Sequence, residues 1–140
     1  MNNYIDVKNL IPQQPPFVFI DTIFDVSRTS LYSNFTITEK TLLCENGQFR
    51  EGGLIENIAQ TAAAYIGYFN TSEPKIGVIG AIKNFTTYAL PAVGETLTTK
   101  LTIEQEIFNM ILCNAEIRIS NKLIATCEMK VAIPEDGIQF

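Results

Sequence analysis

The stretch GQFREGGLIENIAQTAAAYIGYF, residues 47–69, decides the fold of this chain. It reads as a short loop followed by an almost entirely apolar helix, with the carboxylate of Glu56 in the first turns of that helix. From Gly53 onward, apolar residues recur every three or four positions, which is the period of one helix face. These residues are Ile55, Ile58, Ala59, Ala62, Tyr65, Ile66 and Phe69. The pattern predicts a helix of about four turns that ends at Asn70 and the TSEP that follows it.

Strand patterns surround this helix. IPQQPP, residues 11–16, must be extended or turning because of its prolines. Residues 17–27 and 30–38 are rich in β-branched and aromatic residues, and they predict two strands before the helix. Four more strands are predicted after it, at residues 75–88, 95–107, 109–120 and 122–133. The turn PAVG precedes the second of these four, and a tight turn at Asn121 joins the last two.

Long antiparallel strands after one buried helix predict an α+β fold. No repeat, low-complexity segment or linker interrupts the chain, so residues 1–140 are expected to form a single domain. One apolar helix does not cover both faces of a sheet of this size. The sheet is therefore expected to curl around the helix, and its exposed remainder favours a dimer.

Composition and charge exclude several classes of function. The net charge of −5 and the pI near 4.7 argue against a nucleic-acid-binding surface. No apolar run approaches the roughly 18 residues that span a membrane, and the first residues lack a signal-peptide pattern. We therefore expect a cytoplasmic protein. Its cysteines, Cys44, Cys113 and Cys127, are expected to be reduced and packed.

The chain contains no histidine. This excludes a Ser-His-Asp relay, a Cys-His pair and most catalytic zinc sites. Three cysteines far apart in the sequence do not favour a structural zinc site either. We expect no metal and no cofactor, so acid–base chemistry would fall to Glu, Asp, Lys, Tyr or Cys.

The order of the predicted elements resembles the hotdog fold, in which a curled antiparallel sheet wraps one long central helix. The sequence further resembles the 3-hydroxyacyl-[acyl-carrier-protein] dehydratases of fatty-acid synthesis. LIPQQPPFVFID resembles the opening LPHRYPFLLVD of that family, and GLIENIAQTAA resembles its helix GVLIIEALAQ. AIKNFTTYALPAVGETL resembles GIDKARFKRPVIPGDQL, and NKLIATCEMKVAI resembles the final strand. The resemblance covers nearly the whole chain, in the family's order.

The resemblance implies an active site that has lost its histidine. In that family a His from one subunit and a helix Glu from the other form the site. Glu56 matches the Glu, and Gln60 matches the Gln that follows it. Gln48, in GQF, stands where the family has the His of its GHFPG motif, and the loop from there to the helix is shorter. Gln13 likewise replaces the His of the opening motif.

Dehydration of a 3-hydroxyacyl thioester needs a base for the C2 proton, an acid for the hydroxyl and a donor at the thioester oxygen. Glu56 suits one proton transfer or both in sequence. The N–H groups near Gly53 and Leu54 suit the thioester oxygen, with Phe49 beside the substrate. Gln48 forms hydrogen bonds but does not titrate, so it cannot replace a His whose loss costs about 10²–10⁴ in rate. The alternative for Glu56 is a surface carboxylate favoured by the helix dipole.

Small and polar residues form a strip along the predicted helix. They are Glu56, Gln60, Ala63, Ala64 and Gly67. Such a strip allows close approach of an acyl chain, or of a partner backbone in a dimer seam. Near the expected tunnel mouth, Arg50, Lys75 and Lys83 suit a phosphopantetheine phosphate or an acidic carrier surface, with a solvated surface as the alternative.

Three functions stay open from the sequence. The first is a dehydratase of acyl-carrier-protein or coenzyme A thioesters in fatty-acid or polyene synthesis. The second is a non-catalytic acyl-binding subunit, or the heterodimer partner of a dehydratase that supplies the His. The third is a thioesterase that uses Glu56. In each case we expect a homodimer, a higher oligomer or such a heterodimer.

Overall fold

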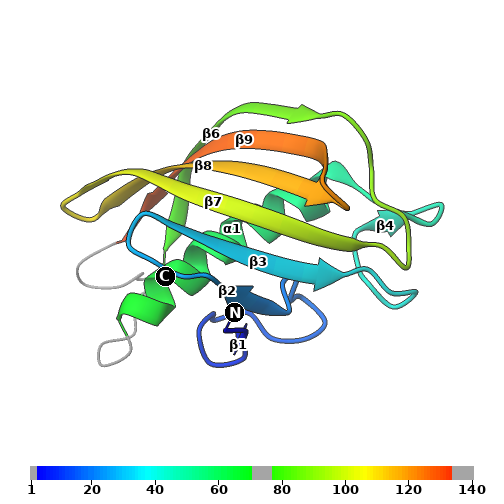
Figure 1. Ribbon diagram of the computed structural model, residues 1–140, viewed down its shortest axis with the longest axis horizontal. Helices are drawn as coiled ribbons and strands as arrows, with labels where there is room; N and C mark the ends of the chain where they lie inside the picture. The colour runs from blue at the N-terminus through cyan, green and yellow to red at the C-terminus, as the bar shows by residue number, and fades with distance from the viewer. Residues whose placement is uncertain (1–2, 71–76, 134–140) are drawn as a thin grey trace.

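One long helix packs against one antiparallel sheet in the computed structural model, which describes residues 3–70 and 77–133 (Figure 1). The helix, α1, spans Glu51–Phe69. The sheet has seven strands in the order β1-β2-β3-β7-β8-β9-β6. A two-stranded hairpin, β4–β5, lies at the end of the molecule where α1 begins. This arrangement confirms the predicted α+β hotdog architecture.

The strand bounds confirm most of the predicted strands. The bounds are β1 Ile5–Asp6, β2 Thr22–Phe24, β3 Ser30–Thr36, β4 Cys44–Glu45, β5 Gln48–Phe49, β6 Val78–Thr87, β7 Thr96–Ile107, β8 Met110–Ile119 and β9 Lys122–Ala132. The strand predicted at 17–27 is wrong outside β2. Before β2, the Gln60 side chain of α1 binds the backbone at Phe17 and Phe19, and after it Asp25 has a positive φ angle. The helix ends at the predicted Asn70, its C-cap, while TSEP lies outside the described residues.

The buried face of α1 differs from the predicted one. Its buried residues are Gly53, Leu54, Asn57, Ile58, Gln60, Thr61, Ala62, Ala64, Tyr65 and Ile66. Ile55, Ala59 and Phe69, which the apolar pattern placed on this face, are only half-buried. The rotation follows from polar residues within the helix that find hydrogen-bond partners inside the protein, so that burying them costs little.

The N-terminal segment runs antiparallel along α1. The carbonyl oxygen of Leu10 lies against Gly67, and further along the chain Phe17 and Phe19 bind Gln60. A Cβ added at Gly67 would fall 2.1 Å from the Leu10 oxygen, so only glycine permits this approach. Part of the small-residue strip therefore accommodates a segment of the same chain.

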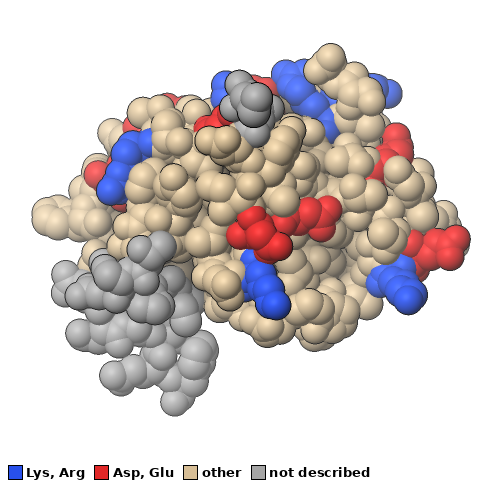
Figure 2. Space-filling view, turned by 60° about the horizontal axis from the view of Figure 1, so that its bottom comes forward, with Lys and Arg blue, Asp and Glu red and all other residues tan. Residues whose placement is uncertain are grey.

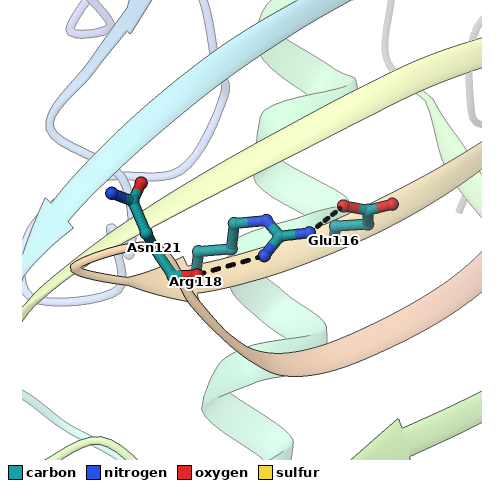
Figure 3. Close-up of polar contacts among 3 residues, drawn as sticks. All are labelled: Glu116, Arg118 and Asn121. Carbon is teal, nitrogen blue, oxygen red and sulfur yellow. Dashed lines mark hydrogen bonds and ion pairs between the residues drawn. The ribbon is translucent and has the colours of Figure 1, made fainter.

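Two tight turns shape the sheet and the short hairpin. Ser120 and Asn121 both have positive φ angles, as a two-residue hairpin turn between β8 and β9 requires. Arg118 donates hydrogen bonds to the Asn121 carbonyl oxygen at 3.2 Å and to the Glu116 carboxylate at 3.0 Å (Figure 3). Asn46 and Gly47 form the corresponding turn between β4 and β5.

Strand β6 is one edge of the sheet, and its side chains are largely exposed. The exposed fractions are 40% for Val78, 38% for Ile79 and 39% for Ile82. An apolar edge strand with unpaired backbone groups favours pairing with another chain. Within the described residues, no helix is both long and apolar enough to cross a membrane.

Replacing Gly67 by alanine is expected to destabilise the protein, although Gly→Ala inside a helix usually stabilises by about 0.5–1 kcal/mol. The added methyl group would collide with the Leu10 carbonyl. Gly52 is the matched control because a Cβ there meets nothing within 4 Å. Urea unfolding should give a lower midpoint for G67A and an equal or higher one for G52A. Equal stability of the two variants would contradict the packing described.

The thiols differ in burial and in acidity. Cys113 and Cys127 are buried, whereas Cys44 is half-buried. Burial, with a smaller effect of the neighbouring Cys127, raises the pKa of Cys113 to about 12. Burial and the nearby Glu128 raise the pKa of Cys127, and burial alone raises the pKa of Cys44.

We expect Ellman's reagent to label Cys44 alone in the native protein at pH 8. Thiolate is the reactive species, and a thiol with a pKa of 12 is ionised at that pH in roughly one molecule in 10⁴. Labelling of Cys44 should accelerate about tenfold per pH unit below its pKa. All three cysteines should react after denaturation. Fast native labelling of Cys113 or Cys127 would be inconsistent with their burial.

Candidate active site

Glu56 lies in the second turn of α1 and is half-buried. Across residues 3–70 and 77–133, its carboxylate has no hydrogen-bond or ion-pair partner. Ile55, Ala59 and Ala63 share this half-buried side of the helix. The carboxylate therefore remains available to a substrate or to a second chain.

The start of α1 offers backbone donors, at positions other than those predicted. The N–H groups of Gly53 and Leu54 both donate to the Arg50 carbonyl oxygen, at 2.9 and 3.1 Å. The side chain of Arg50, the N-cap residue, caps nothing. Among the described residues, the N–H groups of Glu51 and Gly52 have no acceptor. The first N–H groups of a helix have no acceptor within it, so these two are the open donors.

The other predicted substrate-binding residues, Phe49 and Leu54, belong to the buried hydrophobic core at this helix end. Phe49 is fully buried, and its ring centroid lies 5.8 Å from that of Phe19 and 5.7 Å from that of Phe35. A Cβ at Gly53 would fall 2.4 Å from the Phe49 ring, so the helix begins directly against this ring. Leu54 is fully buried as well.

Gln48 lies on the surface in β5, paired with Glu45 of β4. The β4–β5 hairpin, which contains it, lies at the end of the molecule where α1 begins (Figure 1). Phe49, the next residue, anchors the hairpin by donating its N–H to the Pro91 carbonyl oxygen at 2.8 Å. No hydrogen bond joins Gln48 to Glu56 in the part of the chain that is described.

Gln60 is 1% exposed, and both ends of its carboxamide are occupied. Its Oε1 accepts the Phe19 N–H at 2.7 Å, and its Nε2 donates to the Phe17 carbonyl oxygen at 2.9 Å. These bonds tie the N-terminal segment to the helix turn after Glu56. This arrangement favours a positioning role for Gln60 over direct contact with substrate.

Sequence reasoning missed a buried polar group beside Glu56. Asn57, Thr61, Ser33 and Thr99 are all fully buried. Thr99 donates to the Asn57 Oδ1 at 2.6 Å, and the Ser33 and Thr61 hydroxyls lie 2.7 Å apart. A signal for this group was present in the sequence. Gln60 and Thr61 follow Asn57 by three and four residues, so these three polar residues share one face of a largely apolar helix.

The cations expected at a tunnel mouth are dispersed. Arg50 contacts the Glu51 carboxylate at 3.3 Å, and both side chains are more than 40% exposed, so this pair stabilises little. Lys83 is exposed on β6, and Lys75 lies outside the described residues. Figure 2 shows acidic and basic groups scattered over one face, without a continuous basic surface. The described residues also hold no group of three or more His, Cys, Asp or Glu side chains suited to a metal ion.

Residues 5–140 match the sequence profile of the ApeP dehydratase family, described as ApeP-like. The chain belongs to the ApeP-like dehydratase family. An uncharacterised thioester dehydrase of Halalkalibacterium halodurans is 27% identical over an alignment of 143 positions, which includes 92% of this chain and 88% of that protein.

Solved structures share the fold of this ApeP-like chain. A chain of the dehydratase heterocomplex ApeI:P from Xenorhabdus doucetiae matches with a TM-score of 0.86 and 16% identity, covering 95% of this chain and 93% of that one. A hypothetical thioesterase from Streptococcus pneumoniae, solved with coenzyme A, matches with a TM-score of 0.65 and 12% identity, covering 80% and 84%. At these identities the likeness establishes the hotdog fold.

Gln60→Ala is expected to expose the Phe19 amide to solvent exchange. Its acceptor is the Gln60 Oε1, and alanine provides no replacement. Native-state hydrogen exchange should show at least a tenfold faster rate at Phe19. The Phe49 amide, which donates to Pro91, is the internal control and should keep its rate. Unchanged exchange at Phe19 would show that Gln60 does not hold this segment.

Proposed function

We propose that this chain is the glutamate-bearing subunit of a dehydratase that converts 3-hydroxyacyl thioesters to 2-enoyl thioesters and water. The observation that carries the proposal is the unpartnered, half-buried carboxylate of Glu56 near the open start of α1. Gly52 precedes Glu56 by four residues, about 6 Å along the helix axis. If the thioester oxygen accepts a hydrogen bond from the Gly52 N–H, this spacing places C2 and C3 of the substrate beside the Glu56 carboxylate.

The chemistry assigns a role to each group. A base removes the C2 proton, and the electron pair moves to the thioester carbonyl, whose oxygen becomes negative. The N–H groups of Glu51 and Gly52 stabilise that oxygen, because preorganised donors act where charge develops. The electron pair then returns to form the C2=C3 double bond, and the C3–O bond breaks as an acid protonates the departing hydroxyl, which leaves as water. Glu56 supplies one of these two proton transfers, and the other needs a second titratable group.

That second group is proposed to come from another chain. The present chain has no histidine, and Gln48 does not titrate. The exposed apolar edge of β6 suits strand pairing with a related hotdog subunit. The structural match to a chain of a dehydratase heterocomplex supports this proposal. A histidine-bearing dehydratase is the expected partner, and a homodimer is the alternative.

The substrate is expected to be carried by acyl carrier protein or coenzyme A. Arg50 is adjacent to the open donors, and its side chain is partly exposed. When its ion pair with Glu51 breaks, its guanidinium can bind a phosphate group of the carrier. Cytoplasmic fatty-acid or polyene synthesis is the setting that the proposal implies.

Dehydration should require both subunits and Glu56. Mass spectrometry of a 3-hydroxyacyl thioester incubated with this chain and a histidine-bearing homologue should show loss of water. Glu56→Ala should lower that rate by about 10²–10⁴-fold, because one acid–base group is removed. Glu116→Gln is the control, since it neutralises an exposed carboxylate that is bound to Arg118.

Three results would contradict this function. Equal rates with and without the Glu56 carboxylate would exclude its role. Full activity of this chain alone would exclude the need for a second subunit. Release of free acid and thiol, abolished by Glu56→Ala, would instead assign a thioesterase.

A further inference from the structure

Asn57 follows Glu56 directly and is fully buried between α1 and the sheet. Its Nδ2 donates to the Phe19 carbonyl oxygen at 2.7 Å, and its Oδ1 accepts from the Thr99 hydroxyl at 2.6 Å. One side chain thus binds the helix to β7 and to the N-terminal segment. A leucine of similar size would fill the same space without either bond.

A second bridge lies one turn further along the helix. Thr61 donates its hydroxyl proton to the Asn57 carbonyl oxygen at 2.8 Å, so Ser33 is the donor in the 2.7 Å contact between the two hydroxyls. Ser33 and Thr99 are direct cross-strand partners on β3 and β7. Two residues one helical turn apart therefore meet two paired strand residues and form a buried polar square.

We propose that Asn57 is the positioning residue for Glu56, because its two bonds fix the rotation of this helix turn about the axis. Consecutive helix residues point about 100° apart. When Asn57 is held against Thr99, Glu56 is turned toward the half-buried strip that Ala59 and Ala63 also line. The bond from Asn57 to the Phe19 carbonyl oxygen ties the same helix turn to the N-terminal segment of the chain.

An apolar side chain would not hold this rotation as narrowly. Hydrophobic contacts are non-directional, whereas hydrogen bonds weaken steeply away from their preferred angle. Buried donors and acceptors also disfavour any rotation that leaves them unpaired. The two bonds of Asn57 therefore define the direction of Glu56 as well as the depth of this helix turn.

The test compares three variants in the complex with the histidine-bearing homologue. Asn57→Leu removes both bonds, and Thr99→Val removes one without changing the helix. Ser33→Ala is the matched control, because it removes a buried helix–sheet bond at Thr61, away from the turn of Glu56. Asn57→Leu should lower kcat by about 10²-fold, as misplacement by about 1 Å does, with KM within about twofold.

Thr99→Val should lower kcat by a smaller factor in the same direction, and it keeps the test decisive should Asn57→Leu not fold. Ser33→Ala should keep kcat within about twofold. Equal losses of kcat in Ser33→Ala and Thr99→Val would reduce Asn57 to a general stabilising role and overturn the proposal.

This inference rests on the proposed function of Glu56. A second, structural readout therefore distinguishes failure of the positioning role from failure of the proposed function. Crystal structures of Asn57→Leu, Thr99→Val and Ser33→Ala should show the Glu56 carboxylate displaced in the first two variants only. An unmoved carboxylate in those two overturns the positioning role whatever the activity. If the unmodified complex dehydrates nothing, the proposed function fails, while the structures still decide whether Asn57 positions Glu56.

Discussion

The buried polar square between α1 and the sheet is the constraint on which the rest of this structure depends. Asn57 and Thr61 on the helix meet the cross-strand partners Thr99 and Ser33, and all four are fully buried. A helix with alanines and isoleucines around most of its circumference has no strongly preferred rotation from hydrophobic burial alone. The satisfied hydrogen bonds of Asn57 supply that preference, because any other rotation would leave this buried amide unpaired.

With this rotation, one side of the helix is only half-buried and can be reached by a ligand. Glu56 lies on this side without a partner in the described chain, and the open N–H groups of Glu51 and Gly52 lie one turn before it. Next to these donors along the chain, Gly53 packs against the Phe49 ring, which belongs to the buried core. The candidate site thus combines a carboxylate with fixed dipoles, and the sequence contains no histidine to supply the second proton transfer.

The sequence predicted the architecture well because helix and strand periods are local properties. The strands from β6 to β9 and the helix end at Asn70 follow from alternation and turn residues. Tertiary hydrogen bonds explain the failures. Residues 17–21 have strand composition, yet they form no strand. Their backbone groups at Phe17 and Phe19 instead form hydrogen bonds with the side chains of Gln60 and Asn57. The Gly53 and Leu54 donors have a local explanation instead: the helix begins at Glu51, before the predicted start, so both N–H groups already bond the Arg50 carbonyl oxygen. Glu56 is singled out as a candidate only through family resemblance, since composition alone favours a surface carboxylate.

The most direct test of the central claim is a crystal structure of this chain with a histidine-bearing dehydratase subunit and a non-reactive 3-hydroxyacyl thioester analogue. The account predicts that β6 lies in the interface and that the thioester oxygen accepts a hydrogen bond from the Glu51 or Gly52 N–H. It also predicts that Glu56 and the partner's histidine each lie about 3 Å from the groups between which protons move. An analogue bound away from Glu56, or an interface that leaves β6 exposed, would contradict it.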